Sequence, residues 1–161
     1  MQTEMIFASL LAITLIFIAI LYLFNSLKET LIVMSVIPFS LLGVYIGHYF
    51  MGLNISLPSL IGALGLAGVI VNDGIIMMDT INKAKAKDEI FQLAARRLRP
   101  ILLTSITTVV GLSSLIFFAT AEAVVFQPLA VSMGFGLLWG TILNLFYLPT
   151  MYTFSSGKKF H

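Results

Sequence analysis

The chain has 161 residues, of which 59% are hydrophobic and only 10% are charged, and its formal net charge is +2. A soluble domain has roughly 45–50% apolar and roughly 25% charged residues, and a chain this short cannot hide such an apolar excess from water. These values exclude an ordinary soluble domain, indicate a protein whose solvent is lipid, and give no support to nucleic-acid binding. The absence of cysteine excludes disulfides, thiolate metal sites and cysteine nucleophiles.

Five hydrophobic segments follow one another, and each is long enough to cross a bilayer. A helix needs about 20 apolar residues to span about 30 Å of hydrocarbon. The predicted spans are residues 5–24, 31–51, 59–81, 100–121 and 127–154. The first span lacks a preceding basic region and is too long for a signal-peptide core, so we expect it to stay in the membrane. The predicted fold is an all-α membrane protein, with residues 1–161 forming a single five-helix transmembrane bundle.

The only long polar segment, residues 82–99, connects the third and fourth spans. Asp88 and Glu89 are typical of a helix N-terminus, and the arginines up to Arg99 are typical of a C-terminus, because each group complements the helix dipole. We therefore expect a short helix that ends at Arg99 and lies as a surface connector beside anionic headgroups. A dedicated regulatory or partner-binding site is the alternative for this loop.

All nine basic residues lie in three segments that five spans would place on one side of the membrane. They are Lys28, Lys83, Lys85, Lys87, Arg96, Arg97, Arg99, Lys158 and Lys159. The segments expected on the opposite side, residues 1–4, 52–58 and 122–126, contain no Lys or Arg. The positive-inside rule therefore predicts an external N-terminus, and a cytoplasmic C-terminus and polar loop.

The third span carries a carboxyl group near its middle, at Asp73, beside the amide of Asn72. An ionised Asp at the centre of a bilayer costs on the order of 2.5–3.5 kcal/mol, so this side chain should face other helices or water. It should also hold a proton for part of the time, which is the property of a proton carrier. A protonated Asp that only bonds neighbouring helices is the alternative. Asp79, near the cytoplasmic end, is a secondary relay candidate, although simple contact with water explains it as well.

Small and hydroxyl side chains recur at helical spacing in the third and fourth spans. Gly65, Gly68 and Asn72 share one face, which predicts the close approach of another helix or a part in a polar relay. The fourth span has a comparable stripe, formed by Thr104, Thr107, Thr108 and Gly111. Its hydroxyls could relay a proton to Asp73, or they could serve packing and bond only their own backbone.

Two further faces predict close packing between helices. They are formed by Gly43 and Gly47 in the second span, and by Ser132, Gly136, Gly140 and Asn144 in the fifth. Pro38 should kink the second span, and His48 should lie at the membrane interface and not bind a metal. The sequence has no zinc-binding helix motif, phosphate-binding glycine loop or nucleophile–base pair, so we expect no enzymatic activity, metal or cofactor.

Three segments resemble the C-terminal membrane half of the resistance-nodulation-cell division efflux permeases. They are residues 37–43 (IPFSLLG), 65–79 (GLAGVIVNDGIIMMD) and 97–105 (RLRPILLTS), followed in the same order by Gly111, residues 134–136 and residues 148–149. The resemblance implies that the five spans correspond to helices eight to twelve of a twelve-helix permease. Such permeases are proton-driven antiporters of the Gram-negative inner membrane, which export drugs, lipids or metal ions.

The resemblance also implies roles for particular residues and partners for the chain. Asn72 and Asp73 match the tenth-helix segment of the family's proton relay, and Thr104 matches a hydroxyl of the eleventh helix. The best-known drug pumps have a lysine at the position of Asn72, so Asp73 is expected to titrate in its place. The permeases are usually trimers that work with a periplasmic adaptor and an outer-membrane channel in multidrug resistance.

Several parts of such a permease are missing from this sequence: the acidic pair of the fourth helix, the first seven spans and the periplasmic substrate-binding domains. We therefore expect a permease fragment that requires an N-terminal half and does not transport alone. A non-transporting membrane protein, such as an assembly partner or an inert remnant, is the alternative. A lipid-exporting or protein-exporting relative is another, because substrate choice lies in the periplasmic domains.

Overall fold

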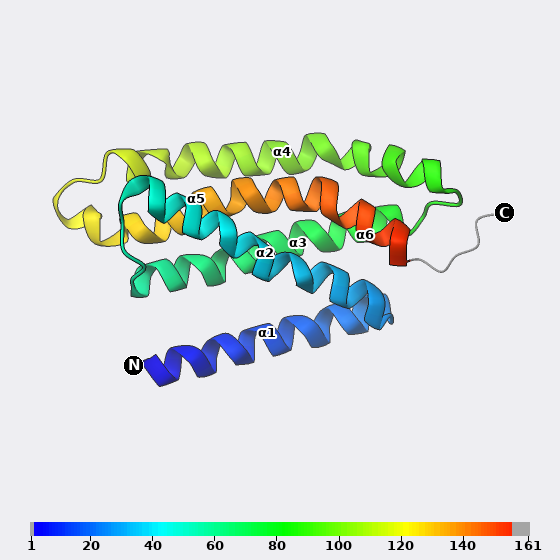
Figure 1. Cartoon of the computed structure of the whole chain (residues 1–161), viewed down its shortest axis with the longest axis horizontal. Coiled ribbons are helices and arrows are strands. Elements are labelled where there is room, and N and C mark those ends of the chain that lie inside the picture. Colours follow the sequence, from blue (N-terminus) through cyan, green and yellow to red (C-terminus); the bar gives the residue numbers. More distant parts are fainter. Residues whose placement is uncertain (1, 156–161) are drawn as a thin grey trace.

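The computed structural model describes residues 2–155, which form five long helical rods and contain no strand (Figure 1). Its helices are α1 (Gln2–Phe24), α2 (Leu27–Met51), α3 (Leu57–Ile81), α4 (Lys87–Phe117), η1 (Ala121–Phe126), α5 (Gln127–Ile142), η2 (Leu143–Tyr147) and α6 (Leu148–Ser155). α5, η2 and α6 follow one another without a break and make up most of the fifth rod. η2 is a π-helical turn. Five helices are long and apolar enough to cross a membrane, which confirms the predicted all-α membrane bundle. The basic residues Lys158 and Lys159 lie outside the described residues.

Tight turns connect the first three helices. Asn25 ends α1 in a left-handed conformation, with φ 49°, which asparagine tolerates better than most residues. Ser26 then caps the start of α2. Gly52, with φ 65°, ends α2 in the conformation that favours glycine. At the start of α3 the hydroxyl of Ser59 accepts a hydrogen bond from the backbone N–H of Ser56. The three helices therefore run antiparallel, one after another.

α4 is longer than the sequence suggested, and the expectation of a separate helix ending at Arg99 is wrong. The helix begins at Lys87 and continues through Pro100 to Phe117. Proline lacks a backbone N–H, so Pro100 leaves the carbonyl of Arg96 without its helical partner. Arg96 is exposed in the polar segment, where solvent can satisfy that carbonyl. The polar connector is therefore the first part of a membrane-spanning helix.

α5 lies at the centre of the bundle, in contact with α2, α3 and α4 (Figure 1). Glycines permit this approach. A Cβ at Gly43 of α2 would lie 2.6 Å from the Cβ of Trp139 and 2.9 Å from the carbonyl oxygen of Phe135. A Cβ at Gly140 of α5 would overlap Ile70 of α3. Gly47 and Gly136 are packed in the same way, so the helices meet nearly backbone to backbone.

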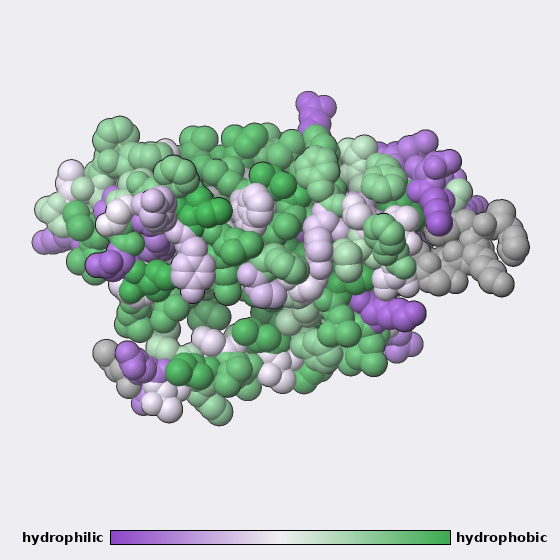
Figure 2. Space-filling view, in the orientation of Figure 1, coloured by the Kyte–Doolittle hydropathy of each residue, from purple (hydrophilic) through white to green (hydrophobic). Residues whose placement is uncertain are grey.

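α1 stands apart from the other helices along most of its length and meets α2 near the turn that joins them (Figure 1). An apolar cavity of about 450 Å³ separates it from α2 and α3, with Met5, Ile13, Leu41 and Leu60 among its lining. The hollow is visible beside α1 in Figure 2. The same view shows an apolar surface along the rods and hydrophilic groups gathered toward the two ends, as expected for a bundle in lipid.

Candidate functional site

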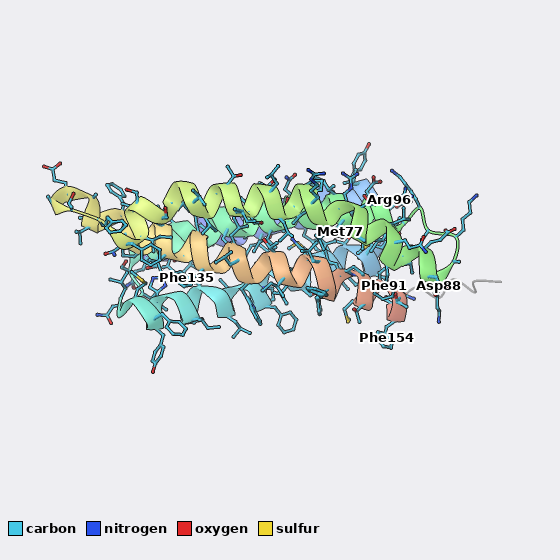
Figure 3. The ribbon with its side chains drawn as sticks, turned by 90° about the horizontal axis from the view of Figure 1, so that it is seen from above. Met77, Asp88, Phe91, Arg96, Phe135 and Phe154 are labelled. Carbon is cyan, nitrogen blue, oxygen red and sulfur yellow. The ribbon has the colours of Figure 1, made fainter. Side chains whose placement is uncertain are left out.

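Asp73 is the only acidic side chain among residues 2–155 that is buried, with 6% of its surface exposed. Its Oδ2 atom has no hydrogen-bond partner among those residues. The face on which it lies continues one turn later to Met77, which is enclosed in the bundle (Figure 3). A carboxyl oxygen that is buried without a partner costs free energy.

Helical geometry directs the Asp73 side chain toward the junction of α3, α4 and α5. Ile70, one turn earlier, packs against Gly140 of α5. Thr80, two turns later, accepts a hydrogen bond of 2.8 Å from Arg97 Nε of α4. At about 100° per residue, position 73 lies between positions 70 and 80 around the helix axis. The carboxyl is therefore enclosed by protein on the side that faces α4 and α5.

Asn72 points the other way, onto a face of α3 that no described helix covers. It is exposed, as are Gly65 and Gly68 on the same side. A Cβ at Gly68 would meet nothing within 4 Å, and one at Gly65 would touch only the end of Met133, at 3.6 Å. The structure thus separates Asn72 from Asp73. Within residues 2–155, the predicted packing face of α3 has almost no partner.

The hydroxyls of the α4 stripe bond their own helix. Each donates to the carbonyl four residues earlier, at 2.7 to 3.0 Å: Thr104 to Pro100, Thr107 to Leu103 and Thr108 to Thr104. Thr104 and Thr107 are exposed, and a Cβ at Gly111 would meet nothing within 4 Å. Because α3 and α4 run antiparallel and Thr80 bonds Arg97, Thr104 lies near the level of Asp73 along the bundle. Thr104, Thr107 and Asn72 are thus exposed, Thr108 is half-buried, and none of them is bonded to the buried carboxyl.

Other polar side chains occupy the interior at this level. Ser105, next to Thr104, is buried, and its hydroxyl is hydrogen-bonded to the hydroxyl of Thr141 of α5. Asn144, in the π-helical turn η2, is 1% exposed and donates through Nδ2 to the carbonyl oxygen of Ile70 at 3.1 Å. Its Oδ1 atom has no partner among the described residues. The sequence pattern assigned Asn144 to packing, and it could not show that Ser105, not Thr104, faces inward.

Three charged groups lie toward the C-terminal end of α3: Asp79, Lys83 and Arg97. Asp79 is 61% exposed and forms an ion pair of 3.2 Å with Lys83, which is 69% exposed, so water screens the pair and it stabilises little. Arg97 is half-buried and bonds Thr80. It lies about 10 Å along the bundle from the level of Asp73, given a rise of about 1.5 Å per residue. The charge pattern of the loop did not reveal that this arginine enters the bundle.

His48, near the end of α2, is buried where this helix contacts α3. Its Nδ1 lies 2.9 Å from the carbonyl oxygen of Val44, and its Nε2 lies 2.8 Å from the hydroxyl of Ser59. A carbonyl can only accept, so Nδ1 carries a hydrogen. The Nδ1 bond lies within α2, and the contact of Nε2 with Ser59 ties α2 to α3. Among residues 2–155, no three His, Cys, Asp or Glu side chains gather in a way that could hold a metal ion.

Comparison with known proteins matches nearly the whole chain. A family model described as the AcrB/AcrD/AcrF family matches residues 1–156. The cobalt-zinc-cadmium resistance protein CzcA of Cupriavidus metallidurans is 30% identical over 152 residues, which are 91% of this chain and 14% of that protein. The multidrug resistance protein MdtC of Pectobacterium atrosepticum is 30% identical over 159 residues, 95% of this chain and 16% of that protein. The chain therefore spans 14% to 16% of the length of these relatives.

The arrangement of the helices is also found in solved structures. In the X-ray crystal structure of a heavy metal efflux pump, crystal form II, the matching region has a TM-score of 0.82 and 27% sequence identity. The match covers 88% of this chain and 15% of that one. Crystal form I gives a TM-score of 0.77 at 26% identity. The likeness thus extends from the sequence to the packing of the bundle.

Proposed function

Because this chain belongs to the AcrB/AcrD/AcrF family of resistance-nodulation-cell division efflux permeases, we propose that its helices form part of the membrane domain of a proton-driven exporter of small molecules. The family consists of transporters, not enzymes. The observation that carries the proposal is the buried, unpartnered carboxyl of Asp73 inside a helix that can span the membrane. An exporter driven by a proton gradient needs such a group within the bilayer, able to bind and release a proton.

In this proposal Asp73 is the titrating group of the relay, and Asn72 and Thr104 extend the relay toward the rest of the membrane domain. We define the open face as the exposed side of α3 and α4 formed by Gly65, Gly68, Asn72, Thr104, Thr107 and Gly111. Its small side chains suit the close approach of further membrane helices, and its amide and hydroxyls suit polar contact with them. Thr107, Thr108 and Asp79 are secondary relay candidates.

We further propose that the permease lies in the bacterial inner membrane, with the N-terminus in the periplasm and the C-terminus in the cytoplasm. Every basic residue that the structure describes lies at or beyond one end of the spans: Lys28, Lys83, Lys85, Lys87, Arg96, Arg97 and Arg99. The loops at the opposite end, residues 52–56 and 118–120, contain none. This asymmetry favours a cytoplasmic position for the basic end.

The complete exporter is expected to be a trimer that works with a periplasmic adaptor and an outer-membrane channel. The names of the relatives include resistance to metal ions and resistance to many drugs, although they share this membrane segment. We infer that the substrate is selected by parts of the exporter outside these helices. A protein that supports assembly without transporting is the second candidate, because the open face of α3 and α4 lacks a partner within the described chain.

The test is export by the complete permease that contains this segment, reconstituted in lipid vesicles. A pH gradient is imposed, zinc ions and ethidium serve as probes, and a pH-sensitive dye reports proton counterflow. We expect Asp73→Asn to reduce export and proton counterflow to the level of protein-free vesicles, because an amide cannot carry the proton.

The matched control is Glu122→Gln, which neutralises an exposed acidic residue in η1, remote from the buried junction. We expect this variant to export as the unchanged protein does. Full export by Asp73→Asn would contradict the role of this carboxyl in coupling. Failure of the unchanged permease to export either probe or to move protons would favour the non-transporting alternative.

A further inference from the structure

Two buried oxygen atoms without hydrogen-bond donors lie at the same level of the bundle. They are Oδ2 of Asp73, on α3, and Oδ1 of Asn144, in η2. The two side chains are 6% and 1% exposed. Buried polar atoms nearly always have a partner, so two acceptors without donors at one level of the bundle suggest that a single donor can serve both.

Asn144 contacts the turn of α3 that carries Asp73. Asn144 Nδ2 donates to the carbonyl oxygen of Ile70 at 3.1 Å. Asn144 Oδ1 lies 3.5 Å from the position that a Cβ at Gly74 would occupy. Asp73 stands between Ile70 and Gly74, so its side chain leaves the same helical turn that the amide contacts. The amide is fixed by its bond to Ile70, and its free oxygen remains available to the neighbouring carboxyl.

No other charged group among the described residues competes at this level. α5 and η2 contain no charged side chain, and the hydroxyl of Tyr147 lies 2.9 Å from that of Ser35, with which it shares a hydrogen bond. In α2, the charged and titratable groups Lys28, Glu29, His48 and Tyr49 lie near the helix ends. Tyr45 lies further from the end of the helix. α4 contributes Arg97, two turns toward the cytoplasm. The hydroxyls of Ser105 of α4 and Thr141 of α5 are hydrogen-bonded to each other.

We propose that Asp73 and Asn144 form a two-residue proton site, in which a proton bound to Asp73 Oδ2 is donated to Asn144 Oδ1. This inference rests on the proposed function and adds a positioning residue to it. The proton comes from water, one O–H bond forms at the carboxyl on loading, and the same bond breaks on release. The amide does not titrate; it stabilises the loaded carboxyl. Loading therefore adds a hydrogen bond between α3 and η2, which links the state of Asp73 to the fifth rod.

The experiment is infrared difference spectroscopy of the full chain in lipid bilayers, recorded between high and low pH. Asp73→Asn identifies the carboxylic C=O band of Asp73 by removing it. We expect Asn144→Leu to move that band to higher wavenumber and to displace its titration midpoint, because the protonated carboxyl loses its acceptor. Asn144→Gln keeps an amide oxygen and should restore part of both changes. Ser132→Ala, which removes another buried unpartnered oxygen from the same rod, should change neither.

A second measurement requires no change at Asn144. Asparagine labelled with ¹³C at its side-chain carbonyl should show a downshifted amide band when Asp73 is loaded, and Asp73→Asn should abolish that shift. If the Asp73 band titrates but ignores Asn144→Leu, and the labelled amide does not respond, the pairing is wrong while the proposed function stands. If Asp73 shows no titrating band at all, proton binding at this residue fails, and the proposed function fails with it.

Discussion

At the scale of single residues, Ala121 carries backbone strain at the start of η1. Its φ of 45° lies in the left-handed region, which costs an L-residue with a Cβ roughly 1–2 kcal/mol. Glycine avoids this cost but loses about 0.5–1 kcal/mol through its more flexible unfolded chain. We expect Ala121→Gly to raise the free energy of unfolding in detergent by about 0.5–1 kcal/mol. A lower value than that of the unchanged chain would contradict the assignment of strain.

The buried histidine leads to a second prediction at this scale. Both ring nitrogens of His48 are hydrogen-bonded, and removing the ring would break the hydrogen bond between α2 and Ser59 of α3. We expect His48→Ala to lower the free energy of unfolding by about 1–3 kcal/mol, because a buried hydrogen bond and the packing of the ring are lost. Tyr49→Ala is the control, because this neighbouring side chain is 85% exposed. Equal losses in the two variants would show that the buried hydrogen bonds of His48 do not matter.

At the scale of the helices, some glycines pack against a neighbouring helix and others face no other helix. A Cβ at Gly43 would be forced against the backbone of α5, whereas one at Gly68 would meet nothing. We expect Gly43→Ala to destabilise the chain by about 1–3 kcal/mol, as overpacking does. Gly68→Ala should be neutral or stabilising by up to about 1 kcal/mol, because alanine favours helix. Unfolding in detergent measures both, and the reverse order would contradict the packing described for α5.

The sequence predicts the helices better than the details of the site. Five apolar segments follow directly from the length that a bilayer demands, and the five long apolar helices of the structure agree with them. Charge alone suggested a helix end at Arg99, because the pattern cannot show that the carbonyl freed by Pro100 is exposed. Similarly, the prediction that Asn144 belongs to a packing face assumed a regular α-helix. In the structure a π-helical turn sets the direction of that side chain.

The prediction of Asp73 as the central residue rested on the cost of a charge in lipid, and the structure buries it. Its neighbours were harder to choose. Thr104 and Ser105 are adjacent hydroxyls, and only the packing of α4 against α5 decides that Ser105 is inside. A sequence pattern gives the period of a helix but not its rotation relative to the neighbouring helices.

At the scale of the whole molecule, the orientation of the bundle can be mapped with single cysteines, because the chain has none of its own. Lys85 and Asn54 are exposed in loops at opposite ends. In intact spheroplasts, a membrane-impermeant thiol reagent should label Asn54→Cys and leave Lys85→Cys unlabelled until the membrane is opened. Labelling of Lys85→Cys from outside would contradict the positive-inside assignment.

The account depends above all on proton binding by one carboxyl group inside the bundle. The most direct measurement is the number of protons taken up when the full chain, in lipid nanodiscs, is brought from high to low pH in the presence of an indicator dye. The unchanged chain should take up about one proton more per chain than Asp73→Asn, because that variant lacks a single titrating group. Equal uptake by the two chains across the accessible pH range would contradict the account.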